Sequence, residues 1–552
     1  MRLSTSAVRD LRAMAEERPK WRVGRVAWPG LLQAFAVAVL AIFLYAGLRS
    51  ELPIDDVGRF TPHIAEGIYE WDAAHVFMQP AALLWHRHLG FGAPARTSQE
   101  RFNAFWAGVS LGILYLLLLR LGVKPLRRVL LCLLAALAFN LLCLATSGHI
   151  KLVVLPFLSL SLYHAVLWER DARAGESGRD GRLALSAILL GASAAFLING
   201  LVVAPFLGLA AAAVSLRAGS GPRRALLRLI GVGLLAGGTA FLLLAGGYGL
   251  AAPGPRSMDG FLGFLLKKGD GWHESTGAAE SLARSFFAVI QNFFYLGDFG
   301  AMVRTWLGGD ASVPATQGRT LLGLGVLFAA AVALLAWTYG GALLRLLRDR
   351  GPAMPWAFVL GTLAFAVPWN LNEADFYFQL TFPTVVMLAA APSSPRRPAL
   401  ETAFVVLVAG SVLFGWALPR RDYPLQRHTA ELRSMLTARD LAVHWSYWSG
   451  GPSLLFMDLP GVPRLFPDQI AYRTADSGVM FRRVAETIDR RLADGGRVYL
   501  FDILDGRIWN APWPRLRRKG ITPGRLERFF RERYTVLDRG EMAEMRCWEL
   551  RP

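Results

Sequence analysis

The sequence predicts an α-helical protein that crosses a membrane many times and ends in a small α/β domain. Of its 552 residues, 54% are hydrophobic and only 18% are charged, whereas a soluble domain has about 25% charged residues. The apolar residues gather in runs of about twenty, the length at which a helix spans a bilayer. The mean hydropathy of +0.35 agrees with this pattern. The composition therefore excludes a disordered chain.

The chain begins with a basic segment, residues 1–26, which the apolar run 27–48 follows. A cleaved signal peptide has a shorter apolar core, of about 7–15 residues. We therefore predict a cytoplasmic N-terminal tail and a retained first membrane helix. A signal peptide is the alternative.

Apolar runs predict about 11 transmembrane helices within a domain at residues 27–419. The runs are 27–48, 102–119, 129–146, 152–168, 183–198, 201–216, 226–248, 320–344, 354–371, 376–391 and 399–418. Arginine-rich turns alternate with them, and such turns mark the cytoplasmic side of a membrane protein. Because this rule accounts for the net charge of +19, we expect the lipid bilayer as a partner and no nucleic acid.

The stretch 183–216 decides the topology. Its 34 residues carry no charge, and as one helix it would be about 51 Å long, against a bilayer core of about 30 Å. Asn199 and Gly200 offer a turn at its middle, so we predict two spans rather than one. The domain at 420–552 and the long loops 49–101 and 249–319 then lie outside the cytoplasm.

Residues 420–552 have the pattern of a small α/β domain. We expect strands at 453–458, 497–502, 534–538 and 546–550, and helices at 480–492 and 525–533. The domain lacks a glycine-rich nucleotide fingerprint. The three cysteines of the chain have no metal-binding spacing, so we expect neither a zinc site nor a disulfide framework.

Charged residues that could carry chemistry follow the first predicted span. Asp55 and Asp56 come a few residues after it, and Arg59 and His63 come next. A carboxylate there can take a proton from a hydroxyl, and an arginine beside it can hold a phosphate. A cluster of solvated loop charges is the alternative.

A helix that skims the membrane surface is expected after this cluster. Large apolar residues recur there at seven-residue steps, at Trp71, Met78 and Trp85. This spacing is typical of an interfacial helix, which we expect to break near Pro80, and a helix packed on the transmembrane bundle is the alternative. Asp72 and His75 lie three residues apart on it, which is too few ligands for a metal site.

Two further groups of charges lie in the predicted outer loops. Glu373 and Asp375 lie between two late spans, beside an aromatic run. Lys267 and Lys268 lie in the second long loop, where a lysine can meet an anionic headgroup. We interpret all four as candidate substrate-binding residues, and solvated turns are the alternative.

In this layout the chain resembles the GT-C superfold of membrane glycosyltransferases. The resemblance rests on the two acids after the first span, the skimming helix from Trp71 to Gly90, the span from Arg101 to Leu121, and the polar and aromatic segment from Asn370 to Tyr377. The chain looks like the bacterial branch that uses lipid-linked sugars. That branch includes protein mannosyltransferase-like and aminoarabinose transferase-like enzymes.

The resemblance implies a polyprenyl-phosphate-linked sugar as donor, a glycan, lipid or protein as acceptor, and a site at the outer face of a bacterial inner membrane. It implies that Asp55 or Asp56 is the catalytic base, with Asp72 as the nearest candidate for a second carboxylate. Arg59, His63 and His75 would contact the substrate. The acceptor hydroxyl would displace the lipid phosphate with inversion. Since phosphate is already a good leaving group, no cofactor is required; a divalent metal is the alternative.

Two other classes of protein share parts of this pattern. A transporter or flippase of lipid-linked substrates would need polar groups inside its spans and commonly has an internal repeat. Charges inside the spans are almost absent here, and no repeat is evident. A catalytically silent envelope-assembly protein would keep the fold without depending on any outer carboxylate.

Overall fold

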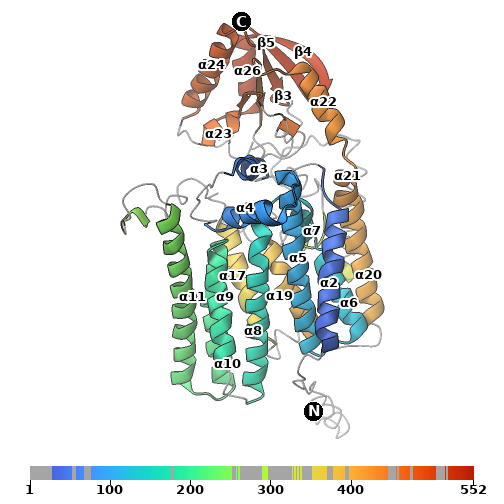
Figure 1. Cartoon of the computed structure of the whole chain (residues 1–552), viewed down its shortest axis with the longest axis vertical. Helices are drawn as coiled ribbons and strands as arrows, with labels where there is room; N and C mark the ends of the chain where they lie inside the picture. The colour runs from blue at the N-terminus through green and yellow to red at the C-terminus, as the bar shows by residue number, and fades with distance from the viewer. Residues whose placement is uncertain are drawn as a thin grey trace, which may run out of the picture.

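The computed structural model describes most of the chain. The described residues are 28–51, 57–67, 76–175, 180–251, 289–295, 351–369, 377–391, 397–445, 461–472, 476–504 and 520–552, with a few single residues elsewhere. They form a helical bundle that carries short helices and an α/β domain at one end (Figure 1). We call this end of the bundle the domain end and the opposite one the loop end.

The bundle contains both long and short helices. They are α2 (Trp28–Gly47), α5 (Ala95–Arg120), α6 (Pro125–Ala136), α7 (Phe139–Thr146), η1 (Ile150–Val154), α8 (Leu155–Arg173), α9 (Asp180–Ala194), α10 (Asn199–Arg217), α11 (Pro222–Ala251), α17 (Ala353–Trp369), η3 (Phe378–Leu380), α19 (Thr381–Ala390), α20 (Arg397–Val412), η4 (Leu413–Ala417) and α21 (Leu418–Arg421). Here η1 and η3 are 3-10 turns, and η4 is a π-helical turn that joins α20 to α21.

Among the described residues, six helices are long and apolar enough to cross a membrane, or seven if the bent pair of α6 and α7 is one span. Two shorter apolar helices lie at 353–366 and 378–390. The chain is thus a multi-pass membrane protein, but the predicted count of about 11 spans is not confirmed. Most of the predicted span 320–344 lies outside the described residues.

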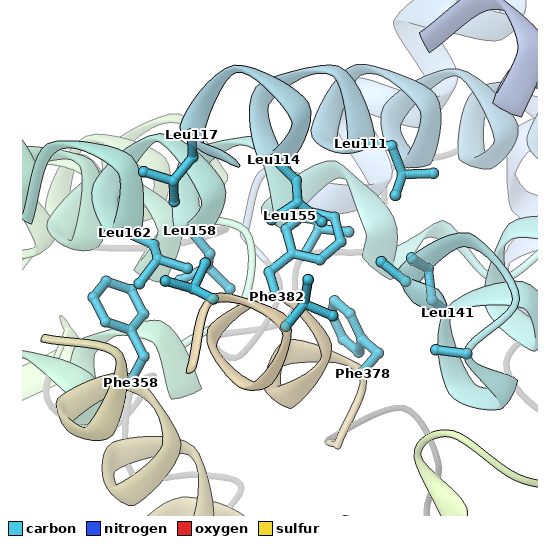
Figure 2. Close-up of a cluster of buried hydrophobic side chains, with 14 of the residues drawn as sticks. Leu111, Leu114, Leu117, Leu141, Leu155, Leu158, Leu162, Phe358, Phe378 and Phe382 are labelled. Atoms are coloured by element: carbon cyan, nitrogen blue, oxygen red, sulfur yellow. The ribbon is translucent and has the colours of Figure 1, made fainter. Parts of the chain in front are cut away.

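The predicted break inside 183–216 is present. Helix α9 ends at Ala194 and α10 begins at Asn199, so the chain turns where Asn199 and Gly200 indicated. The predicted span 129–146 is not one straight helix, because α6 and α7 meet at an angle of 61°. Every residue of α7 is buried, and its Leu141 faces the apolar core formed with α5, α8 and α19 (Figure 2).

Two short helices cross the domain end between the bundle and the C-terminal domain. They are α3 (Val57–Glu66) and α4 (Met78–Leu89) (Figure 1). Their Phe60, Ile64 and Met78 are buried in one cluster with Phe102 of α5 and Ile150 of η1. These helices therefore pack on the bundle, which was the alternative interpretation of the skimming helix.

The predicted break near Pro80 lies close to the start of a helix: Val76 and Phe77 form a turn, and residues 68–75 before them lie outside the described part of the chain. Helix α4 begins at Met78, so Pro80 lies in its first turn. The backbone N–H groups of a first turn have no partner within the helix, and the missing N–H of proline therefore costs nothing there.

The C-terminal domain combines helices with a five-stranded sheet. Its elements are α22 (Leu425–Met435), β1 (Leu441–His444), β2 (Arg464–Leu465), α23 (Pro467–Tyr472), α24 (Ser477–Ala493), β3 (Val498–Phe501), α26 (Pro523–Arg533), β4 (Thr535–Met542) and β5 (Met545–Arg551). The strand order is β2-β1-β3-β5-β4. Strands β2, β1 and β3 are parallel, whereas β5 and β4 are antiparallel to their neighbours.

The predictions for this domain are confirmed at its second half. Helices α24 and α26 and strand β5 cover the predicted segments, and strands β3 and β4 overlap them. The predicted strand at 453–458 is wrong, since Leu455 and Phe456 form a 3-10 turn. Phe456 is buried, and its ring stacks on His444 of β1 with ring centroids 4.2 Å apart. The apolar residues of this segment therefore pack against the sheet without forming a strand.

Candidate functional site

The polar residues of the domain end converge on one turn, Thr146–Lys151, which joins α7 to η1. Asn103 of α5 is fully buried. Its side-chain amide donates to three backbone carbonyl oxygens, those of Leu144 at 3.1 Å, Ser147 at 2.8 Å and His149. One side chain thus holds the end of α7 and the whole turn in a single conformation, as a preorganised site requires.

The chain that leaves α2 is anchored beside this turn. The backbone N–H of Ser50 donates to the carbonyl of Thr146 at 2.9 Å, and that of Glu51 donates to the carbonyl of Arg420 at 2.9 Å. Arg96, in the first turn of α5, donates to the carbonyl oxygens of Ser50 and Glu51 at 2.9 and 2.5 Å. These bonds tie the ends of α2, α7 and α21 together.

Two arginines and two glutamates complete this anchor. Arg49 contacts Glu51 at 2.6 Å and Glu100 at 3.5 Å, and Arg96 contacts Glu100 at 3.1 Å. The hydrogen bond that Arg49 donates to Glu51 raises the pKa of Arg49. These contacts join the end of α2 to the first turns of α5, so this group serves to hold the chain.

Helix α3 anchors the chain on the other side of the two predicted acids. Its Thr61 hydroxyl donates to the side-chain oxygen of Gln99 on α5 at 2.6 Å, and its apolar face is buried. Asp55 and Asp56 themselves lie outside the described residues. Both flanks of their segment are nevertheless fixed at the domain end.

Two titratable side chains are buried in the central turn. His149 is 1% exposed and Lys151 is 4% exposed. Between them, Ile150 packs with Phe60 of α3 and Met78 of α4, so the turn lies directly against both short helices. A charged group among membrane helices is costly and is therefore a functional candidate by default.

Few of the predicted site residues fall on the described part of the chain. Arg59 and His63 lie on α3; His63 is half-buried, and the side chain of Arg59 is outside the described part. The others lie outside it altogether: Asp55, Asp56, Asp72, His75, Lys267, Lys268, Glu373 and Asp375. Among the described residues, no three His, Cys, Asp or Glu side chains come close enough to hold a metal ion.

Asn103, His149 and Lys151 were not predicted from the sequence. A signal was present, because Lys151 borders the predicted span 152–168 and a charge at that place deserves a functional interpretation. The signal for Asn103 was weaker, because a single amide at the start of an apolar run does not indicate which carbonyl groups it contacts in the fold.

A small apolar pocket lies in the bundle between α8, α10, α17 and α19. Leu158, Phe358 and Phe382 line it, and Figure 2 shows these side chains facing one another. Gln379 also lines it, at 5% exposure, and neither polar atom of its amide has a hydrogen-bond partner among the described residues. This amide can bind a water molecule or a polar group of a ligand.

No protein-family model matches the chain, and no curated protein matches its sequence. Among solved structures, ArnT from Cupriavidus metallidurans bound to undecaprenyl phosphate is similar, with a TM-score of 0.54 and 10% identity over 95% of this chain and 98% of that chain. The apo state of ArnT gives a TM-score of 0.40 and 13% identity over 94% and 97%. The S. cerevisiae protein O-mannosyltransferase Pmt1-Pmt2 complex bound to the sugar donor gives 0.32 and 12% over 41% and 34%.

The similarity to ArnT bound to undecaprenyl phosphate extends over nearly the whole of both chains. It therefore includes the bundle, the short helices of the domain end and the C-terminal domain together. The chain has the GT-C fold that its sequence pattern resembles.

Proposed function

We propose that the chain is a membrane glycosyltransferase that moves a sugar from a polyprenyl-phosphate donor to an acceptor hydroxyl. The observation that carries this proposal is the fold shared over 95% of the chain with ArnT, which was solved bound to undecaprenyl phosphate. The anchored flanks of the segment with Asp55 and Asp56 support it, because a catalytic base needs a rigid frame.

In the proposed reaction Asp55 or Asp56 is the base. Its carboxylate takes the proton of the acceptor hydroxyl. The hydroxyl oxygen bonds to the anomeric carbon from the side opposite the phosphate, and the bond between that carbon and the phosphate oxygen breaks, so the configuration inverts. The electron pair leaves with the polyprenyl phosphate, whose charge Arg59 on α3 would stabilise. No metal or other cofactor is required.

The remaining predicted residues take supporting roles in this proposal. Asp72 is the candidate for a second carboxylate. The substrate contacts are His63, His75, Lys267, Lys268, Glu373 and Asp375. The acceptor is a glycan, a lipid or a protein that presents a hydroxyl group.

We also propose that the domain end faces away from the cytoplasm of a bacterial inner membrane. The turns α8–α9 and α10–α11 lie at the loop end (Figure 1) and carry Arg173, Arg217 and Arg224. Positively charged turns favour the cytoplasmic side, so the C-terminal domain and the proposed site lie on the other side.

The test uses the full chain in vesicles with undecaprenyl-phosphate mannose or undecaprenyl-phosphate aminoarabinose as the probe. Release of undecaprenyl phosphate is measured for the wild type, Asp55→Asn, Asp56→Asn and the double variant. We expect the loss of the base to slow release about 100-fold or more. Asp422→Asn is the control, because Asp422 is exposed and pairs with Arg421 at 2.7 Å. Full activity of the double variant would contradict the assignment.

The second candidate is a transporter or flippase of lipid-linked substrates. The buried amide of Gln379 favours it, since polar groups within the bundle are what such proteins need. In the same vesicles a flippase would move the lipid-linked sugar across the bilayer and release no undecaprenyl phosphate. A silent assembly protein would do neither.

A further inference from the structure

We infer that one ordered water molecule binds in the small pocket between α8, α10, α17 and α19, where the side-chain amide of Gln379 holds it. The water links the turn η3 to helices α8 and α17. This inference goes beyond the proposed function and holds whether or not the chain transfers a sugar.

The first argument is the buried amide. Gln379 of η3 is 5% exposed and lines the pocket, and neither its Oε1 nor its Nε2 has a hydrogen-bond partner among the described residues. Burial of an amide without a hydrogen bond costs folding free energy, and a bound water removes that cost. Thr381, two residues further along, differs, because its hydroxyl accepts from the side-chain amide of Asn292 at 3.0 Å.

The second argument is the set of polar groups around the pocket. Ser159 of α8 and Thr362 of α17 also line it, and both are 3% exposed. The Ser159 hydroxyl donates to the carbonyl oxygen of Leu155 at 2.7 Å, so its oxygen can still accept a bond from water, and the Thr362 hydroxyl can donate or accept. A buried water makes about two to four hydrogen bonds, and the amide and the two hydroxyls supply that number.

The third argument is the size of the pocket. The volume open to the centre of a water molecule is about 10 Å³, and one water needs about 10–15 Å³. Every residue that lines the pocket is buried, and its other walls are apolar side chains such as Leu158, Phe358 and Phe382 (Figure 2). An isoprenoid or acyl chain is therefore too large for this space, whereas a water molecule fits beside the polar groups.

The position of Gln379 indicates what the water does. The turn η3, Phe378–Leu380, leads directly into α19, and in the sequence it follows closely on Glu373 and Asp375. Since the amide makes no bond of its own among the described residues, the water supplies the polar link between the start of α19 and helices α8 and α17.

The experiment labels the full chain in nanodiscs with hydroxyl radicals that an X-ray pulse generates from water. Radicals from a buried water modify the side chains beside it, so Phe358 and Phe382 should be oxidised in the wild type despite their burial. Phe404 of α20 is the internal reference, because it is 3% exposed and does not line the pocket. A density map that resolves ordered waters should show one compact peak beside Gln379.

Three variants connect the water to its partners. Gln379→Leu should reduce the oxidation of Phe358 and Phe382 to the level of Phe404, because leucine fills the pocket and offers no hydrogen bond. Thr362→Val removes one partner and should reduce the oxidation in part. Thr384→Val is the matched control, since it is the same exchange on α19 at a residue that does not line the pocket, and it should change nothing.

Three results would overturn the inference. If Phe358 and Phe382 are oxidised no faster than Phe404 in the wild type, the pocket is dry. If Gln379→Leu leaves their oxidation unchanged, the amide does not hold the water. An elongated density that runs out of the pocket would belong to a lipid or detergent chain.

Thermal unfolding tests the link independently. If Gln379 and Thr362 share a water, Thr362→Val lowers the unfolding midpoint of the wild type but not that of Gln379→Leu, in which the water is already displaced. Equal shifts in the two backgrounds would contradict a shared water. Gln379→Met, which keeps the length of the side chain and removes the amide, takes the place of Gln379→Leu if the latter does not fold.

Discussion

Polar side chains fasten helices at both ends of the bundle, but the two ends differ in the buried polar groups that lack a partner. At the loop end, Arg127 of α6 contacts Glu401 of α20 at 2.8 Å. Its guanidinium also donates to the last carbonyl oxygens of α19, those of Leu388 at 2.7 Å, Ala389 at 3.2 Å and Ala391 at 3.0 Å. One arginine therefore joins three helices and satisfies the C-terminus of one of them.

Other charges of the loop end act in the same way. Glu169 of α8 accepts the backbone N–H groups of Ala353 and Met354, at 2.7 and 2.9 Å, and so caps α17. Arg228 of α11 contacts Asp180 of α9 at 2.9 Å and lies over the ring of Trp168 at 5.3 Å. The arginines from which the sequence predicts the cytoplasmic side thus also fasten the helices.

At the domain end, buried polar atoms remain without partners. Among the described residues, this holds for the amide of Gln379, the amide nitrogen of Gln99 and the indole nitrogens of Trp85 and Trp106. The loop end also has such atoms, for example Arg128 Nε and Glu401 Oε2, but these side chains are bonded through their other polar atoms. Buried polar groups are normally satisfied, so the amide of Gln379, with neither atom bonded, can complete its bonds with ligand or water. The comparison separates charges that stabilise the fold from groups that are available for binding.

The largest effect is expected when the contacts of Arg127 at the loop end are broken. Arg127→Leu should lower the free energy of unfolding by about 3–5 kcal/mol, because it removes a buried ion pair with Glu401 and the hydrogen bonds to three backbone carbonyl oxygens. Thermal unfolding of the purified chain in detergent measures it. The double variant Arg127→Leu with Glu401→Leu removes both charges and should recover part of the loss. If the double variant is as unstable as the single one, the ion pair is not what holds these helices.

An intermediate effect extends the comparison to the C-terminal domain, where Asp440 is 2% exposed. Burial alone would raise the pKa of Asp440, but hydrogen bonds from Thr437 and Arg497 outweigh it and hold the pKa below its ordinary value. A carboxyl group with a lowered pKa in the folded state stabilises that state above the pKa of the unfolded chain, about 4. This contribution is lost as the pH falls through the folded pKa.

Asp440→Asn should therefore cost about 1 kcal/mol at neutral pH and make the domain less sensitive to acid. Hydrogen-exchange protection factors of the β1 and β3 amides, measured in the full chain at pH 7 and below pH 4, report both changes. Asp494→Asn, at an exposed helix end, is the control. Equal acid sensitivity of Asp440→Asn and the wild type would show that Asp440 does not carry this dependence.

The smallest expected effect is a change in the unfolding free energy at the domain end, and its sign is opposite to that for Arg127→Leu. Gln379→Leu should leave the unfolding free energy within about 1 kcal/mol of the wild type, or raise it, because it removes a buried amide that has no partner among the described residues. The same thermal unfolding assay measures it. A loss of several kcal/mol would mean that Gln379 is bonded as the loop-end charges are, and the distinction between the two ends would fail.

The sequence predicted those parts of the fold that depend on local patterns. The turn at Asn199 and Gly200, helices α24 and α26, and strands β3 to β5 follow from apolar spacing and from turn residues. The bend between α6 and α7 has no such signal, because the residues at the junction, 135–139, are apolar and include neither glycine nor proline. Strand β1 has four residues, all buried, and its place between β2 and β3 depends on distant crossovers.

The candidate site was predictable only in outline. Charge and position drew attention to Asp55, Asp56 and Arg59, because they follow the first predicted span within a few residues. Neither spacing nor composition connects Asn103 with His149, or Arg96 with Ser50. Those pairs meet because α5 packs against α2 and the chain turns back between α7 and η1.

The sequence by itself therefore determined that the chain belongs in a membrane and which turns carry its positive charges, since the transfer of apolar residues into lipid and the attraction of arginines to one side depend on composition and order. Only the tertiary structure decided which charges are paired and which buried polar atoms of the described residues lack a hydrogen-bond partner. Hydrogen bonds and ion pairs act over a few ångströms, and only the packing of helices brings residues from remote parts of the chain within that range.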